Sequence, residues 1–145
     1  MRALIQRVLS ANVSVENQII GKIDNGILVL LGIAHDDNEE KMKWVVYKIM
    51  NLKIFEDSEG RMGLNLKDVN GELLVVSQFT LYGDVRKGTK PSFTDAAKPE
   101  FANDMYKNFV QYCRVLNVKT EEGRFQAHMM VNLVNDGPVT FMIEK

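Results

Sequence analysis

The sequence contains little of what metal centres, disulfide-bonded proteins and membrane proteins need. It has one cysteine, Cys113, and two histidines, His35 and His128, which stand far apart. One cysteine cannot form an internal disulfide and fits a reducing compartment. No CxxC or HxxxH spacing is present, so we expect no metal site. No apolar run approaches the roughly 20 residues of a bilayer span. Gln6 and Arg7 interrupt the apolar start of the chain, so we expect no signal peptide and a cytoplasmic location.

The chain also lacks an excess of charge of either sign. Its 145 residues include 18 Lys and Arg and 19 Asp and Glu, for a net charge of −1. Proteins that coat nucleic acid regardless of sequence need a basic surface. We therefore expect no DNA partner and no broad RNA coating, although a local basic patch could bind one end of an RNA. P-loop, GxGxxG and GxSxG motifs are absent as well, and the length fits one domain.

The apolar pattern predicts an α+β fold with many strands. Helices are predicted at about 38–51 and 98–116, where apolar residues recur at helical spacing. In the second helix the predicted core stripe is Phe101, Met105, Phe109 and Tyr112. The expected architecture is a single domain, 1–145, of mainly antiparallel, barrel-like strands with two α-helices. Strands are predicted at 2–9, 13–20 (as a hairpin), 27–33, 54–55, 62–69, 73–82, after 118, and at 127–134 and 139–143.

The rest of the fold is organised around the stretch 73–82. The Asn-Gly pair at 70–71 predicts a tight hairpin turn, and the Leu and Val residues after it predict a strand buried on both faces. Ser77, Gln78 and Thr80 then place hydrogen-bonding groups in the core, where each would cost about 1–3 kcal/mol if unpaired. A strand that opens into a pocket resolves this conflict. Because side chains alternate along a strand, these residues can line one site only if the strand bends or ends there.

Residues 77–80 are thus a polar island in apolar surroundings, and a second polar island, Asn-Asp-Gly-Pro-Val-Thr, occupies 135–140. Proline lacks an N–H and is confined to turns and sheet edges, so the residues alone predict a hairpin turn between the last two strands.

The loop 83–91 carries Arg86, Lys87 and Lys90. It fits a solvated loop and a flap that contacts phosphate equally well, and these three side chains are the expected phosphate contacts.

The titratable residues offer no convincing nucleophile and base. Cys113 lies beside the helical stripe and predicts a buried, inert thiol. His128 falls in an apolar strand, which favours a hydrogen-bonded structural histidine over a catalytic one, and His35 falls in an acidic, solvated loop. A Ser-His-Asp triad stays open but disfavoured, because it would depend on one of these two histidines. Trp44 is predicted to be a packing anchor.

Four segments together resemble the bacterial D-aminoacyl-tRNA deacylases. They are Met-Arg-Ala-Leu-Ile-Gln-Arg-Val at 1–8, Ser-Gln-Phe-Thr-Leu at 77–81, Lys-Pro-Ser-Phe at 90–93 and Asn-Asp-Gly-Pro-Val-Thr at 135–140. The resemblance runs from the first residue to the last, in the family's order and at about its length. Each motif alone is weak, whereas the set is specific.

The resemblance implies a homodimeric hydrolase with no cofactor. It would cleave the ester between a D-amino acid, or mischarged glycine, and the 3′ end of a tRNA. It also implies a cis peptide at Gly137–Pro138 that reaches into the partner's pocket, where its backbone carbonyls exclude L-amino acids. Arg7 would help to hold that motif. The pocket floor and catalytic segment would be Ser77, Gln78, Phe79 and Thr80.

The chemistry of an aminoacyl ester agrees with this picture. The ester is activated, so hydrolysis needs a positioned water and stabilisation of the oxyanion, which the N–H groups of Phe79 and Thr80 could supply. The ribose 2′-OH could orient or activate the water. Three alternatives stay open: an esterase with Thr80 as nucleophile, a non-catalytic dimer that grips RNA ends, and a structural dimer without a pocket. Phe79 could pack against the terminal adenine or belong to the core.

Overall fold

The fold is built around β1 (Arg2–Val15), a strand that pairs along both of its edges. The computed structural model describes all residues, 1–145. One edge of β1 pairs antiparallel with β3 (Gly26–Gly32) and then with β2 (Gln18–Ile23), while the other pairs with β8 (Met130–Glu144) along most of its length. The chain reverses between β1 and β2 through two left-handed residues, at 16 and 17. This confirms the predicted hairpin.

Two parallel pairings complete the sheet. β6 (Glu72–Ser77) lies parallel to β3, and β7 (Thr120–Glu122) lies parallel to β6, giving the order β2-β1-β3-β6-β7. Parallel neighbours need a crossover connection. Helices α1 (Glu39–Asn51) and α2 (Pro99–Val115) supply the two crossovers. The prediction of a mainly antiparallel sheet is therefore right for β1 and its neighbours and wrong for β6.

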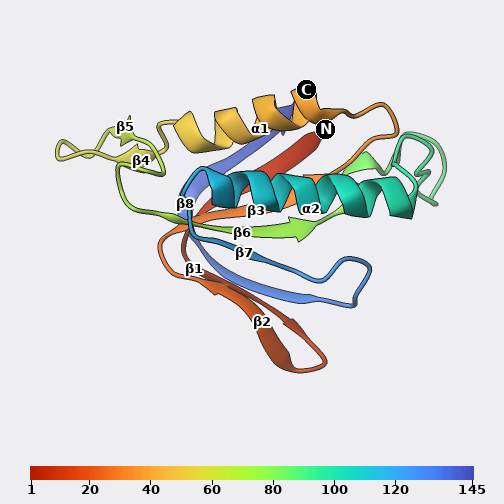
Figure 1. The fold of residues 1–145 in the computed structure, drawn as a ribbon, viewed down its shortest axis with the longest axis horizontal. Coiled ribbons are helices and arrows are strands. Elements are labelled where there is room, and N and C mark those ends of the chain that lie inside the picture. The colour runs from red at the N-terminus through yellow and green to blue at the C-terminus, as the bar shows by residue number, and fades with distance from the viewer.

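The two helices lie side by side over one face of the sheet (Figure 1). Asn38 caps α1 by accepting a hydrogen bond from the Lys41 N–H at 2.9 Å, and Pro99 opens α2, so both predicted helices are confirmed. Phe101 was expected in the core but is 39% exposed. The buried face of α2 begins one position later, about 100° around the helix axis. Its buried residues are Ala102, Met105, Tyr106, Phe109, Val110 and Cys113.

The central strands are buried on both faces, as the apolar runs predict. Leu73 and Val75 of β6 join the main core under the helices, whereas Leu74 and Val76 join a smaller cluster on the other face. The sheet curls until β2 approaches β7, and a Cβ on Gly21 would lie 2.9 Å from the Glu122 carbonyl oxygen. This close approach produces the expected barrel-like shape.

The segment between α1 and β6 differs from its prediction. β4 (Phe55–Glu56) and β5 (Met62–Leu64) form a separate two-stranded hairpin, so β5 does not pair with β6. Asn70 is left-handed, with φ of 50°, and the Gly71 N–H donates to the Leu66 carbonyl at 2.8 Å. The Asn-Gly pair is thus a turn, as expected. It leads out of a short turn region rather than joining two strands of a β-hairpin.

The C-terminal pair of strands is one continuous strand, β8, and the expected hairpin at Gly137-Pro138 is wrong. Asn135 pairs with Val8, and Thr140 pairs with Gln6. Residues 136–139 of β8 therefore stand opposite the single residue Arg7, an arrangement we call the 136–139 bulge. Because β8 pairs only with β1 and lies at the sheet edge, it tolerates a proline without losing a ladder bond.

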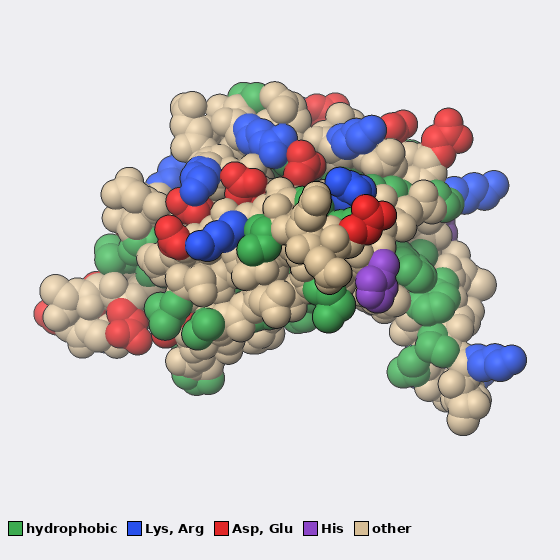
Figure 2. Space-filling view, turned by 90° about the horizontal axis from the view of Figure 1, so that it is seen from below, with side chains coloured by type: hydrophobic (Ala, Val, Ile, Leu, Met, Phe, Trp, Pro, Cys, Tyr) green, Lys and Arg blue, Asp and Glu red, His purple; other side chains and the backbone are tan.

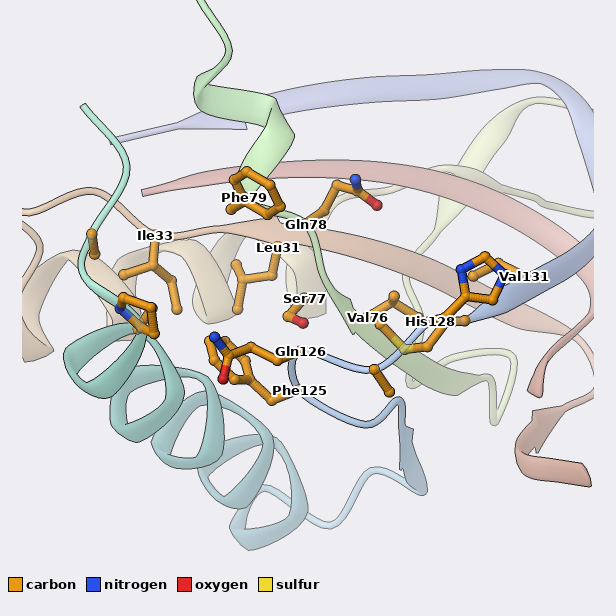
Figure 3. Close-up of a pocket in the computed structure, with 15 residues that line it drawn as sticks. Leu31, Ile33, Val76, Ser77, Gln78, Phe79, Phe125, Gln126, His128 and Val131 are labelled. Atoms are coloured by element: carbon orange, nitrogen blue, oxygen red, sulfur yellow. The ribbon is translucent and has the colours of Figure 1, made fainter. Parts of the chain in front are cut away.

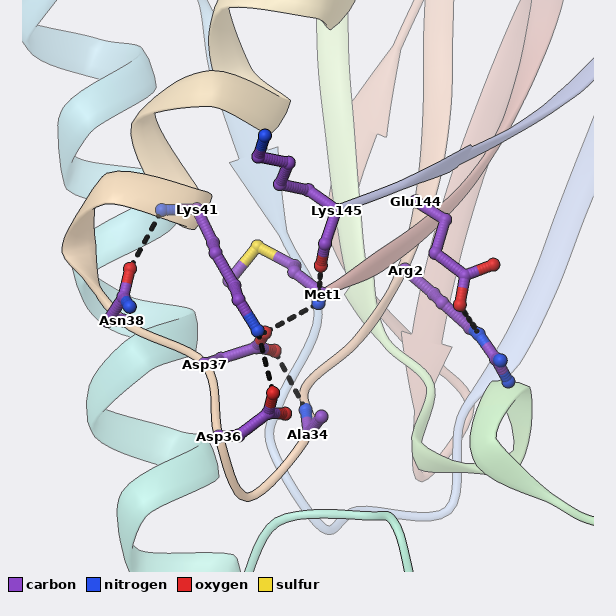
Figure 4. A network of polar contacts seen from close by, with 9 residues as sticks. All are labelled: Met1, Arg2, Ala34, Asp36, Asp37, Asn38, Lys41, Glu144 and Lys145. Atoms are coloured by element: carbon purple, nitrogen blue, oxygen red, sulfur yellow. Dashed lines mark hydrogen bonds and ion pairs between the residues drawn. The ribbon is translucent and has the colours of Figure 1, made fainter.

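The ends of β1 and β8 are tied together (Figure 4). The buried Met1 ammonium lies 2.5 Å from Asp37 Oδ1 and 2.8 Å from the Lys145 carbonyl oxygen. Arg2 bonds Glu144 at 2.8 Å and donates through Nη1 to the Leu81 carbonyl at 2.9 Å. The segment after β6 is thereby held against the start of β1. Neither helix combines the length and the apolar character needed to cross a membrane.

Candidate functional site

The strand β6 ends at Ser77, where its polar residues begin, so the prediction that it must bend or end is confirmed. The Gln78 N–H still donates to the Leu31 carbonyl of β3 at 2.8 Å. The chain then turns into a short 3-10 helix, η1 (Phe79–Tyr82), whose first donor is the Leu81 N–H, 3.3 Å from the Gln78 carbonyl oxygen. The N–H groups of Phe79 and Thr80 precede this bond, so neither has a partner within the helix.

A cavity of about 560 Å³ opens at this end of β6 (Figure 3). It lies between β3, β6, the start of α2 and the loop 123–129. Ser77, Gln78 and Phe79 line it, and His128 is its only titratable lining residue. The site therefore has no acid–base pair of its own. Its remaining walls are mostly apolar and comprise Leu31, Ile33, Val76, Ala97, Pro99, Ala102, Phe125, Gln126, Ala127, Met129 and Val131.

Thr80 stands outside the cavity wall, and its side chain is exposed. Its Oγ1 accepts a hydrogen bond from Gln78 Nε2. A carboxamide cannot take up a proton as a general base. The structure therefore gives the Thr80 hydroxyl no base that would make it a nucleophile.

Phe79 belongs to the mouth of the cavity rather than to the core, because 59% of it is exposed. Its ring centroid lies 5.0 Å from that of Phe93, with the two rings tilted by 59°. Phe93 is held there by the loop after η1, in which Asp84 and Ser92 exchange two backbone hydrogen bonds of 2.8 and 2.9 Å. Two partly exposed aromatic rings thus stand at the entrance.

The three basic residues of this loop are not equivalent. The Arg86 guanidinium binds the Asp84 carboxylate through two nitrogens, at 2.9 and 2.8 Å, and holds the pKa of that carboxyl well below its usual range. Lys87 and Lys90 are exposed and form no ion pair. The two lysines are therefore freer to meet a phosphate than Arg86 is.

The second polar island is held by Arg7, which is 3% exposed. Its Nε lies 3.1 Å from the Asp136 carbonyl oxygen and 2.8 Å from the Asp136 carboxylate. Its Nη1 donates to the Ile54 carbonyl at 2.5 Å, and Glu56 lies 3.7 Å from Nη2. Arg7 thus fastens the 136–139 bulge to the start of the β4–β5 hairpin.

The Gly137–Pro138 peptide is cis, in agreement with the resemblance, and both residues are exposed. Neither they nor Arg7 lines the cavity of their own chain. The expected site residues therefore form two groups, one at the end of β6 and one on the edge strand β8.

Comparison with known proteins places the chain in a family. The family model described as D-Tyr-tRNA(Tyr) deacylase matches residues 4–144. The chain belongs to this family. The protein is accordingly a hydrolase.

Named relatives resemble the chain along nearly its whole length. The D-aminoacyl-tRNA deacylases of Thermosipho africanus, Clostridioides difficile and Shewanella frigidimarina are 56%, 53% and 57% identical over 144 residues. Each match covers 99% of this chain and at least 97% of the relative. A solved structure described as a c-Myc DNA unwinding element binding protein is 40% identical, with a TM-score of 0.94, and covers 100% of this chain and 99% of that one. A probable eukaryotic D-amino acid tRNA deacylase, 18% identical with a TM-score of 0.87 over 98% and 97% of the two chains, shares the fold.

Three further predictions concern titratable groups of this deacylase-family chain. His128 is exposed on the loop before β8, so its placement in an apolar strand with a structural hydrogen bond is wrong. His35 is exposed in a turn, as expected. Cys113 is fully buried, which confirms the predicted buried thiol, and burial raises the pKa of this thiol to about 12. No cluster of three or more His, Cys, Asp or Glu residues could hold a metal ion.

Sequence reasoning missed part of the cavity wall in this family member. The loop residues Phe125, Gln126 and Met129 come to the site from beyond α2, and Ala97 and Ala102 come from its start. No local motif marks them, because their role depends on which end of β6 they pack against. Asn135 and Asp136 stood in the polar island without an assigned role, although both contact Arg7.

Proposed function

We propose that this protein hydrolyses the ester that joins a D-amino acid, or mischarged glycine, to the 3′ end of a tRNA. The amino acid and the tRNA are the products, and the reaction removes wrongly charged tRNA in the cytoplasm. Family membership supports the substrate class. The geometric observation that carries the proposal is the cavity at the end of β6, which contains no acid–base pair and lies where the chain turns into η1, whose Phe79 and Thr80 N–H groups have no partner within the helix.

Such a cavity suits an ester that is already activated. The N–H groups of Phe79 and Thr80 would stabilise the oxyanion, a role in which one donor is worth about 10²–10³ in rate. The 2′-OH of the terminal ribose would orient the attacking water, which the protein's own side chains cannot do as acids or bases. Ser77 and Gln78 would position the substrate, and Phe79 would pack against the terminal adenine beside Phe93.

The proposal includes a homodimer in which the 136–139 bulge of one protomer closes the cavity of the other. Gly137 and Pro138 project from an edge strand and stand away from their own cavity. The same strand exposes large apolar side chains, a pattern typical of association surfaces; they are Met130, Leu133, Val134, Phe141 and Met142. Figure 2 shows that apolar side chains lie in several groups between the charged ones on the face in view.

The partner's bulge would determine which mirror image reacts. Its carbonyl oxygens would occupy the space that an L side chain needs, whereas a D side chain would point outward to solvent. Because nothing reads a side chain in solvent, the enzyme would accept several D-amino acids and glycine. Lys87, Lys90 and, more weakly, Arg86 would contact phosphates of the tRNA.

The direct experiment incubates the purified protein with D-tyrosyl-tRNA and, separately, L-tyrosyl-tRNA and measures released tyrosine. We expect rapid release from the D-ester and little from the L-ester. Binding without release would identify a non-catalytic module that grips RNA ends. Sedimentation of the same sample tests the dimer, and a monomer that still discriminates the two esters would overturn the cross-subunit arrangement.

A further inference from the structure

The side chain of Asn135 bridges the base of the 136–139 bulge. This residue is the last to pair with β1 before the bulge, and Thr140 is the first to pair after it. Asn135 Nδ2 donates to the Arg7 carbonyl at 2.9 Å and to the Val139 carbonyl at 3.2 Å. An amide nitrogen carries two hydrogens, so both are used. One bond ties the bulge to the opposite strand, and the other ties its entry to its exit.

The oxygen of the same amide packs against the tip of the bulge. A Cβ on Gly137 would lie 3.1 Å from Asn135 Oδ1, a spacing tighter than ordinary van der Waals contact. The Asn135 side chain therefore bonds the exit at Val139 and the backbone of Arg7, and its oxygen occupies the space that a side chain at position 137 would need. It thus bridges the loop in which four residues of β8 stand opposite one residue of β1.

Arg7 and Asn135 hold different parts of the bulge. The Arg7 guanidinium bonds the entry, at the carbonyl and carboxylate of Asp136. Asn135 bonds the exit, at Val139, and reaches the backbone of Arg7 rather than its side chain. With only one of them in place, the carbonyls of the bulge could rotate about the end left free.

We propose that Asn135 is a positioning residue for stereoselection, acting by fixing the direction of the bulge carbonyls that an L-aminoacyl ester would meet. This inference rests on the proposed function, in which those carbonyls face the substrate of the partner subunit. Asn135 touches neither the substrate nor the reacting atoms. Its loss should therefore change the discrimination between D- and L-esters more than it changes hydrolysis of the D-ester.

The test compares Asn135→Ala and Asn135→Asp with Asn132→Ala. The aspartate keeps the shape of the side chain but lacks both donor hydrogens. Asn132 is a matched control, because it lies on the same strand, is exposed, and donates through Nδ2 to Asn12 at 3.3 Å. For each protein, two quantities are measured: the ratio of kcat/KM for D- and L-tyrosyl-tRNA, and the amide exchange rates of residues 136, 137 and 139, since Pro138 has no N–H.

In both Asn135 variants, which lose two hydrogen bonds, we expect the D/L ratio to fall by on the order of tenfold. Amide exchange in 136–139 should accelerate, and Asn132→Ala should leave both quantities unchanged. Suppose that the wild-type protein discriminates between the two esters and the Asn135 variants have the same D/L ratio. This result would overturn the inference about Asn135 but not the proposed function, whether or not amide exchange accelerates. If both variants fail to fold, Asn135 serves the fold and not selection, which also overturns it. Wild-type protein that hydrolyses neither ester would instead overturn the proposed function, and this inference with it.

Discussion

The two polar islands of this chain have opposite characters. At the end of β6 the groups are left open: Phe79 and Thr80 have backbone N–H groups without partners in η1, and Phe79 is largely exposed. On β8 the groups are fastened, because Arg7 and Asn135 bond the entry and exit of the bulge. A reacting ester needs free donors that can meet a developing charge, whereas a group that rejects the wrong mirror image must not move. Under the proposed function, this contrast suits the first island to the reaction and the second to discrimination between mirror images.

The largest expected effect comes from removing the 2′-OH of the terminal ribose. If the open island provides only N–H donors, the RNA must supply the help that the protein lacks. D-tyrosyl-tRNA ending in 2′-deoxyadenosine should react about 10²–10⁴ times more slowly, the usual contribution of a positioned acid–base group. Single-turnover hydrolysis of the two esters measures this. A deoxy substrate that reacts at the normal rate would show that the site has a catalytic group of its own.

Replacement of Arg7 should make the 136–139 bulge more mobile and the protein less stable. Arg7→Met removes a buried guanidinium and leaves the carbonyls of Ile54 and Asp136 without their donor. We expect a loss of about 3 kcal/mol, the lower end of the range for breaking a buried pair, because Asp136 is partly exposed. The D/L ratio should fall at the same time. Urea unfolding measures the stability.

The matched control for Arg7→Met is Arg114→Met, at the last turn of α2. Arg114 bonds the Thr120 carbonyl and Glu122 at 3.0–3.2 Å but is far more exposed and serves neither island. The Arg114→Met variant should lose about 1 kcal/mol of stability or less. Equal losses of stability and an unchanged D/L ratio in both variants would mean that Arg7 does not hold the bulge for selection.

A third prediction concerns the Thr80 hydroxyl, next to the open groups at the end of β6. Thr80→Val keeps the backbone N–H and removes only the acceptor of the Gln78 bond. We expect kcat to fall less than about tenfold, since a single hydrogen bond is lost. Thr89→Val, in the exposed loop, controls for a general effect of the substitution. A fall in kcat of more than about a thousandfold would instead indicate that Thr80 is the nucleophile, as in the esterase alternative.

The smallest expected effects concern the loop cations. Lys87→Ala and Lys90→Ala should each raise KM a few-fold and reduce the salt dependence of binding by about one counterion, because each lysine is free to meet a phosphate. Arg86→Ala should do less, since Asp84 already binds that guanidinium. Measuring KM for each of the three variants at several salt concentrations shows which cations contact phosphate. A larger effect for Arg86 would mean that the Asp84 pair opens when tRNA binds.

The predictions from sequence succeeded where a local pattern has one physical meaning. Both helices lie where periodicity and capping residues predict them, because an amphipathic stripe with an N-cap needs no distant partner to be recognised. The end of β6 was predictable for a similar reason, since polar side chains cannot continue a core strand without a cost. Gly137-Pro138 was misread as a hairpin from the residues alone. The two halves of β8 are joined by their shared partner β1, and no local pattern shows which strand lies opposite.

The sequence by itself determined the single α+β domain, the helices, the buried thiol of Cys113 and the identity of the two polar islands. Each of these depends on residues that are near one another along the chain. Only the tertiary structure decided the parallel placement of β6, the cavity wall contributed by the loop 123–129, and the two-sided fastening of the bulge by Arg7 and Asn135. Those features depend on contacts between segments that are distant in sequence, and the energy of such contacts is set by packing and geometry that no short stretch of residues contains.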